Sequence, residues 1–99
     1  MDLNVTQDRR PIRILAVDDH ALVRKGIRLL ISAESDMQLV AEAPTGTEAF
    51  QEFRTHRPDI TIMDLQMPGV SGVEAIIAIR GEFPNGESSF LLRTPATSR

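Results

Sequence analysis

The chain has 99 residues, of which 41% are hydrophobic and 25% are charged, and its formal net charge is -3 at pH 7. This size fits one small globular domain and excludes two, and the acidic balance argues against a nucleic-acid-binding surface over the whole chain. The chain has no cysteine and no apolar run near the ~20 residues that span a membrane, so we expect a soluble, cytoplasmic protein without disulfides or thiolate metal sites.

The chain is expected to begin with a flexible tail over residues 1–11, because this stretch is polar and mixes acidic with basic side chains. The short apolar run Ile12–Val17 follows and is typical of a buried strand. Over residues 21–31 the apolar side chains recur at helical spacing, which predicts an amphipathic helix. Asp19 or His20 could cap the first turn of this helix.

A strand pattern and a helix pattern come next. Hydrophobic and polar residues alternate over Met37–Ala43, which predicts a half-buried strand. Thr45 and Glu48 have the spacing of a capping box, in which each side chain accepts a hydrogen bond from a backbone N–H that the start of a helix leaves free. The helix that they open is expected to end before Pro58.

Residues 59–65 form a second apolar run that ends in an acid, and turn residues separate this run from helical spacing over residues 73–80. Strand and helix therefore alternate three times, which indicates an α/β fold with a parallel sheet. After Gly86 the pattern stops, and the segment that should supply the next strand has only three apolar residues, 90–92. We therefore expect three strands and an incomplete sheet.

Acidic residues follow two of the predicted strands. Asp18 and Asp19 come directly after the first strand, and Asp64 lies near the end of the third. Ligands bind at the carboxyl ends of the strands in open α/β sheets, so the three carboxylates would share one crevice if these strands are neighbours. Like charges ~4 Å apart repel by roughly 1–4 kcal/mol per pair, and Mg2+, which prefers oxygen ligands, would relieve that repulsion. One carboxylate could then attack phosphorus and form an acyl phosphate.

Two segments, AVDDHALVRKGIRLLI and DITIMDLQMPGVSGVEA, resemble the receiver domains of response regulators, specifically the LuxR-type (NarL/FixJ) class. The resemblance covers residues 12–85 and implies a flavodoxin-like, doubly wound parallel sheet that is incomplete at the C-terminus. It implies that Asp64 accepts a phosphoryl group from a sensor histidine kinase. It also implies that Asp18, Asp19 and Asp64 hold Mg2+, with the backbone carbonyl of Gln66 as a further ligand. His20 is as well explained by the helix start as by a role in phosphotransfer.

The resemblance breaks near the C-terminus. Receivers carry a Ser or Thr at the end of the fourth strand and a Lys after the fifth, but counting without gaps places the hydroxyl position at Leu92, and no Lys follows Lys25. A single-base deletion near Gly86 would explain this departure. The expected organisation is therefore a tail over 1–11, the N-terminal part of a receiver domain over 12–85, and an aberrant or frameshifted tail over 86–99.

Three functions stay open on the sequence alone. The leading one is a signalling domain without enzymatic turnover, from a parent transcription regulator that binds DNA and can form a homodimer; this chain itself would bind neither nucleic acid nor membrane. The second is a Mg-dependent aspartyl phosphohydrolase, although such enzymes usually place another acid where this chain has Gln66. The third is a truncated fragment with no function.

Overall fold

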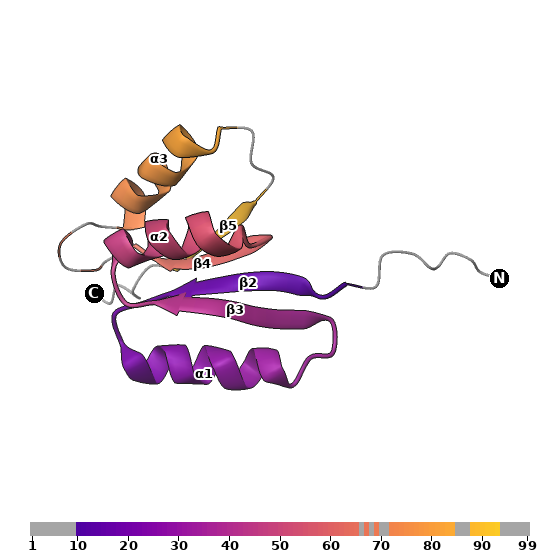
Figure 1. The fold of residues 1–99 in the computed structure, drawn as a ribbon. Coiled ribbons are helices and arrows are strands. Elements are labelled where there is room, and N and C mark those ends of the chain that lie inside the picture. Colours follow the sequence, from indigo (N-terminus) through magenta and orange to yellow (C-terminus); the bar gives the residue numbers. More distant parts are fainter. Residues whose placement is uncertain (1–9, 66, 68, 70–71, 85–87, 94–99) are drawn as a thin grey trace.

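A computed structural model describes residues 10–65, 67, 69, 72–84 and 88–93 of the chain (Figure 1). These residues form one four-stranded sheet, in which every pair of neighbouring strands is parallel, and three helices. The elements in chain order are β2 (Ile12–Val17), α1 (Ala21–Ser32), β3 (Met37–Ala43), α2 (Gly46–His56), β4 (Ile60–Asp64), α3 (Gly72–Glu82) and β5 (Ser89–Arg93). Within the described part of the chain, no helix is long and apolar enough to cross a membrane.

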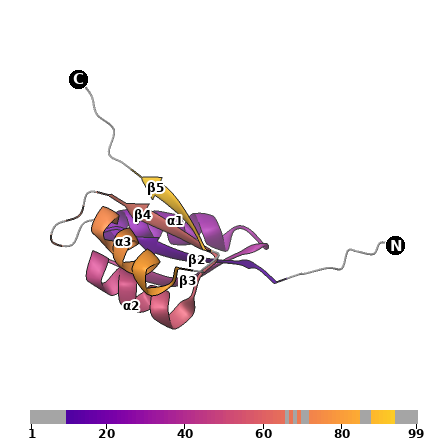
Figure 2. The ribbon, with the colours of Figure 1, turned by 90° about the horizontal axis from the view of Figure 1, so that it is seen from above.

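The strand order is β3-β2-β4-β5, so β2 lies between β3 and β4. The chain moves to one side of β2 when it forms β3, and then returns across β2 to form β4. Because connections between parallel strands are right-handed, this reversal places α1 on one face of the sheet and α2 and α3 on the other (Figures 1 and 2). The predicted doubly wound parallel sheet is therefore confirmed, and its strand order reverses between β2 and β4.

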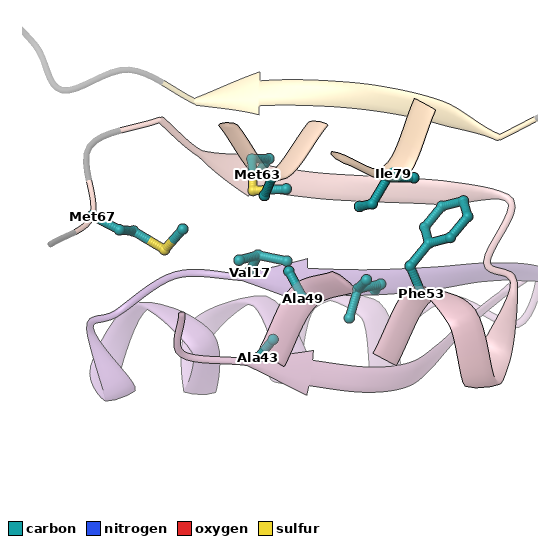
Figure 3. Packing of buried hydrophobic residues seen from close by; sticks show 9 residues of the cluster. Val17, Ala43, Ala49, Phe53, Met63, Met67 and Ile79 are labelled. Carbon is teal, nitrogen blue, oxygen red and sulfur yellow. The ribbon is translucent and has the colours of Figure 1, made fainter. Parts of the chain in front are cut away.

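The main core lies between the sheet and the pair α2 and α3. Val17 and Met63 project from neighbouring strands toward side chains of both helices, including Ala49, Phe53 and Ile79 (Figure 3). The ring of Phe53 stacks on that of Phe90 from β5, with the centroids 6.1 Å apart and the planes within 7°. Burial of each large side chain contributes roughly 1.5–3 kcal/mol, so this layer fixes the register of the central strands.

Helix α2 begins and ends where the sequence predicts. The Thr45 hydroxyl accepts a hydrogen bond from the backbone N–H of Glu48 at 3.1 Å, which confirms the Thr45 half of the capping box. At the other end Arg57 adopts a left-handed conformation with φ 46°, and its N–H donates to the carbonyl of Phe53 at 2.8 Å. The helix thereby stops before Pro58, whose ring could not continue it.

The start of α1 differs from the prediction. His20 is the N-cap residue, but its side chain makes no capping hydrogen bond. Its ring Nδ1 lies instead 2.9 Å from a carboxylate oxygen of Asp18.

The expectation of three strands is wrong, because β5 adds a fourth. Its five residues pair in parallel with β4, from Ser89 beside Ile60 to Arg93 beside Asp64. The backbone groups on that side of β4 gain partners, and Phe90 packs into the core. An edge strand can be this short and this weakly apolar, since only one of its faces is buried; Leu91 stays 61% exposed. The frameshifted origin of residues 86–99 is untested and stays a prediction.

Candidate functional site

The pairing of β2 with β4 brings the acidic residues together. Val17 lies beside Met63, so the residues that follow them, Asp18 and Asp64, emerge at the same end of adjacent strands. Both of these aspartates are buried, whereas Asp19 is exposed. This confirms the expectation that the first and third predicted strands are neighbours.

Four side chains converge at this end of the sheet. Asp18, Asp19, Asp64 and His20 each offer one ligand atom, and these four atoms lie within 4.8 Å of one another. Gln66, the fourth metal ligand expected from the resemblance, lies outside the described residues. The structure thus assembles the three predicted carboxylates in one place, together with an imidazole.

The side chain and the backbone of Asp18 both form hydrogen bonds. Its Oδ1 accepts from the backbone N–H of His20 at 2.8 Å and lies 2.9 Å from the His20 ring. Its own N–H donates to the carbonyl of Ala43 at 3.0 Å, and its carbonyl accepts from the Arg24 guanidinium at 2.7 Å. The first two contacts orient the carboxylate, and the other two hold the backbone of Asp18.

His20 is the first of two cationic groups at the site. Its Nδ1 also lies 3.1 Å from an oxygen of Asp19, while most of its side chain faces solvent. The hydrogen bond with Asp18, followed by the negative charge of Asp19, raises the pKa of His20 above its ordinary value. The imidazole is therefore protonated over a wider pH range than a free histidine and offsets part of the acidic charge.

Arg93 is the second cationic group, and the sequence did not predict it. Its Nη1 lies 3.4 Å from Oδ2 of Asp18 and 3.6 Å from Oδ2 of Asp64. The position that counting assigned to a hydroxyl, Leu92, pairs with Met63 and has an aliphatic side chain. The only available signal was an arginine directly after the last apolar triplet of the chain.

Gly72 fixes the approach of α3 to the site. A Cβ atom added there would lie 2.5 Å from the carbonyl oxygen of Asp64 and 2.9 Å from the Cα of Leu65. The helix can begin this close to the end of β4 only because residue 72 has no side chain. Gly69, in the connection that precedes α3, has φ 76°, a conformation that also favours glycine.

The donor set fits a divalent cation that prefers oxygen. Three carboxylates within a few ångströms repel one another by roughly 1–4 kcal/mol per pair, and His20 and Arg93 offset this charge only in part. Mg2+ accepts one or two carboxylates with water and phosphate oxygens as its remaining ligands. Asp64, buried beside Asp18, is placed to act as a nucleophile toward a phosphoryl group bound there.

The fold and the site together define an α/β domain with a cluster of acidic side chains at the reversal of strand order. Residues 14–91 match the family model described as "Response regulator receiver domain". The chain belongs to this family, whose members are signalling domains, as the resemblance predicted. The match extends past residue 85, into β5.

Among curated proteins, the chain is 43% identical over 84 residues to the oxygen regulatory protein NreC of Staphylococcus epidermidis, covering 84% of this chain and 38% of that protein. It is 39% identical over 74 residues to the uncharacterized transcriptional regulatory protein YhcZ of Bacillus subtilis, covering 75% of this chain and 35% of that protein. The chain thus spans little more than a third of the length of these relatives.

Solved structures show the same fold. A LuxR-family two-component response regulator from Aurantimonas sp. is 40% identical, with a TM-score of 0.79 over 89% of this chain and 61% of that chain. The response regulator domain of Thermotoga maritima CheB is 31% identical, with a TM-score of 0.79 over 91% of this chain and 65% of that chain. These similarities confirm the receiver fold.

Proposed function

We propose that this chain is a phosphoacceptor domain that takes a phosphoryl group on Asp64 in the presence of Mg2+. The observation that supports it best is the meeting of buried Asp64 with Asp18 and Asp19 at the carboxyl ends of adjacent strands. The donor is a sensor histidine kinase, and the acceptor is a carboxylate oxygen of Asp64.

Each side chain has a separate task in this transfer. Asp18, Asp19 and Asp64, with the backbone carbonyl of Gln66 that the resemblance implies, would hold the ion, and the bound ion would neutralise negative charge on the transferring group. An oxygen of Asp64 forms a bond to phosphorus while the bond from phosphorus to the donor nitrogen breaks, and the nitrogen keeps the electron pair. The hydrogen bonds from His20 hold Asp18 in position.

The parent protein in this proposal is a cytoplasmic transcription regulator with a separate DNA-binding domain, and it can act as a homodimer. This extension rests on the relatives, one of which is named an oxygen regulatory protein and another a transcriptional regulatory protein. The chain corresponds to little more than a third of each, so the remaining length would hold the DNA-binding part. We propose no contact with DNA for this chain itself.

Phosphorylation from a small-molecule donor tests the proposal directly. The folded chain is incubated with Mg2+ and acetyl phosphate and its intact mass is measured, in parallel with Asp64→Asn and the matched control Asp36→Asn, which removes an exposed carboxylate from the turn before β3. The wild type and the control should each gain one phosphoryl group, and both gains should vanish without Mg2+. A folded wild-type chain that gains no mass, or an equal gain in Asp64→Asn, would overturn the proposal and favour a fragment without function.

A further inference from the structure

We propose that the Arg93 guanidinium competes with the divalent cation for the carboxylates of Asp18 and Asp64, and thereby sets the metal affinity of the site. This inference rests on the proposed function, because it assumes that the acidic pocket binds a metal. It adds a regulatory residue supplied by β5, the strand that the sequence did not predict.

The contacts of Arg93 are with two buried carboxylates from different strands. A single nitrogen, Nη1, lies 3.4 Å from Oδ2 of Asp18 and 3.6 Å from Oδ2 of Asp64. The side chains of these aspartates are only 2% and 3% exposed, so their charges are poorly screened by water. The guanidinium therefore contacts one oxygen of each of the two buried carboxylates.

Arg93 and a metal ion compete for the same two carboxylates. Mg2+ binds its oxygen ligands at about 2.0–2.1 Å and tolerates little distortion of its octahedral shell. An ion held by Asp18 and Asp64 would lie close to Nη1, and the like charges would repel each other. Binding of the ion would therefore weaken or break the ion pairs of Arg93, and the free energy of these lost ion pairs would lower the observed metal affinity.

The side chain of Arg93 can move while its backbone stays in the sheet. The carbonyl of Arg93 accepts a hydrogen bond from the N–H of Leu65 at 3.1 Å, and the residue pairs with Asp64 across the sheet. The side chain itself is 41% exposed. It can swing into solvent without disturbing the strand.

The other cationic side chains near the crevice make different contacts. Arg24 donates to the backbone carbonyl of Asp18 and pairs with Glu42, and these contacts do not involve the carboxylate oxygens of Asp18. His20 contacts Oδ1 of Asp18, the other oxygen of that carboxylate. Arg93 thus differs from these two side chains, because it forms ion pairs with both Asp18 and Asp64.

A Mg2+ titration monitored by backbone amide NMR shifts tests the competition. The variants are Arg93→Gln and the control Arg54→Gln, which removes the same charge from the exposed pair of Arg54 with Glu82 at the last turns of α2 and α3. The Kd for Mg2+ should fall about two- to fivefold in Arg93→Gln, since this is the affinity equivalent of a partly exposed ion pair. Arg54→Gln should keep the wild-type Kd.

The outcomes separate this proposal from the function on which it rests. Equal Kd values in all three chains, weaker binding by Arg93→Gln, or the same tightening in both variants would overturn the role of Arg93 and leave the metal site standing. Absence of Mg2+ binding in every chain would overturn both.

A second measurement needs no substitution and so does not depend on how a variant folds. In the wild-type chain the side-chain Nε–H resonance of Arg93 should shift with Mg2+, at the same midpoint as the amides of Asp18 and Asp64. If this resonance stays unchanged while those amides shift, the competition is refuted.

Discussion

A methyl group at position 72 should disrupt both the fold and the acidic site. The nearest heavy atom to an added Cβ is the carbonyl oxygen of Asp64 at 2.5 Å, whereas ordinary van der Waals contact begins at 3.4 Å, so about 0.9 Å of separation is missing. Two of the three nearest atoms are backbone atoms, at Asp64, the last residue of β4, and at Leu65, and that strand is hydrogen-bonded to β2 on one side and to β5 on the other. It cannot move aside without breaking those ladders.

The cost can be estimated from overpacking in cores. Gly72→Ala should lower the free energy of unfolding by about 3 kcal/mol, the upper part of the range for forced methyl groups. For a domain of this size that corresponds to a fall in Tm of roughly 10–25 °C. Because the displaced atoms belong to Asp64 and Leu65, phosphorylation of the folded fraction should also become slower.

Gly81→Ala is the matched control, because Gly81 lies in the same helix and an added Cβ there meets nothing within 4 Å. This change should raise stability by about 0.5–1 kcal/mol, since alanine favours a helix over glycine. Differential scanning calorimetry of the three chains measures both effects. If Gly72→Ala melts at or above the wild-type Tm, the close approach of α3 to Asp64 is not what positions that helix, and the reasoning is refuted.

Three further substitutions test other parts of the fold by denaturant unfolding. The hydrogen bond with Arg28 lowers the pKa of Glu42, so Glu42→Gln should lower the free energy of unfolding by about 1 kcal/mol at pH 7. This loss should shrink as the pH falls below the ordinary glutamate pKa and disappear below the pKa of Glu42 in the folded state. A loss independent of pH would contradict this. Thr61→Val should stabilise the chain by about 1 kcal/mol, because the buried Thr61 hydroxyl has no hydrogen-bond partner among the described residues; destabilisation would indicate a bridging water. Phe53→Ala should lower the free energy of unfolding by about 3–5 kcal/mol and speed hydrogen exchange in β5, because Phe90 loses its stacking partner. Unchanged hydrogen exchange in β5 would contradict that coupling.

The sequence predicted the central elements well because their signals are local. The apolar runs that became β2 and β3 have the predicted bounds, and β4 is one residue shorter at each end than the run that predicted it. The acids at the ends of β2 and β4 could be placed together from topology alone, since parallel strands present their carboxyl ends at one edge.

The elements that the sequence missed depend on distant partners. Strand β5 has a weak pattern of its own and is stabilised by the unsatisfied edge of β4 and by stacking of Phe90 on Phe53. The ion pairs of Arg93 arise only after β5 has paired, so no spacing rule within the sequence could predict them. The sequence also left open whether Asp19 or His20 caps α1, and the contact of the His20 ring with Asp18 could not be read from the spacing of residues.

The position of β2 between β3 and β4 also ties ligand binding to folding. Asp18 and Asp64 meet only after the chain has closed a long loop that contains α1, β3 and α2, so the unfolded chain offers no comparable site. A cation that binds only the native chain stabilises it by mass action, by about 2.7 kcal/mol at a hundredfold excess over Kd. If the proposed site binds Mg2+, thermodynamic linkage would couple the ion to folding, and removing the ion would raise the unfolded fraction of the chain.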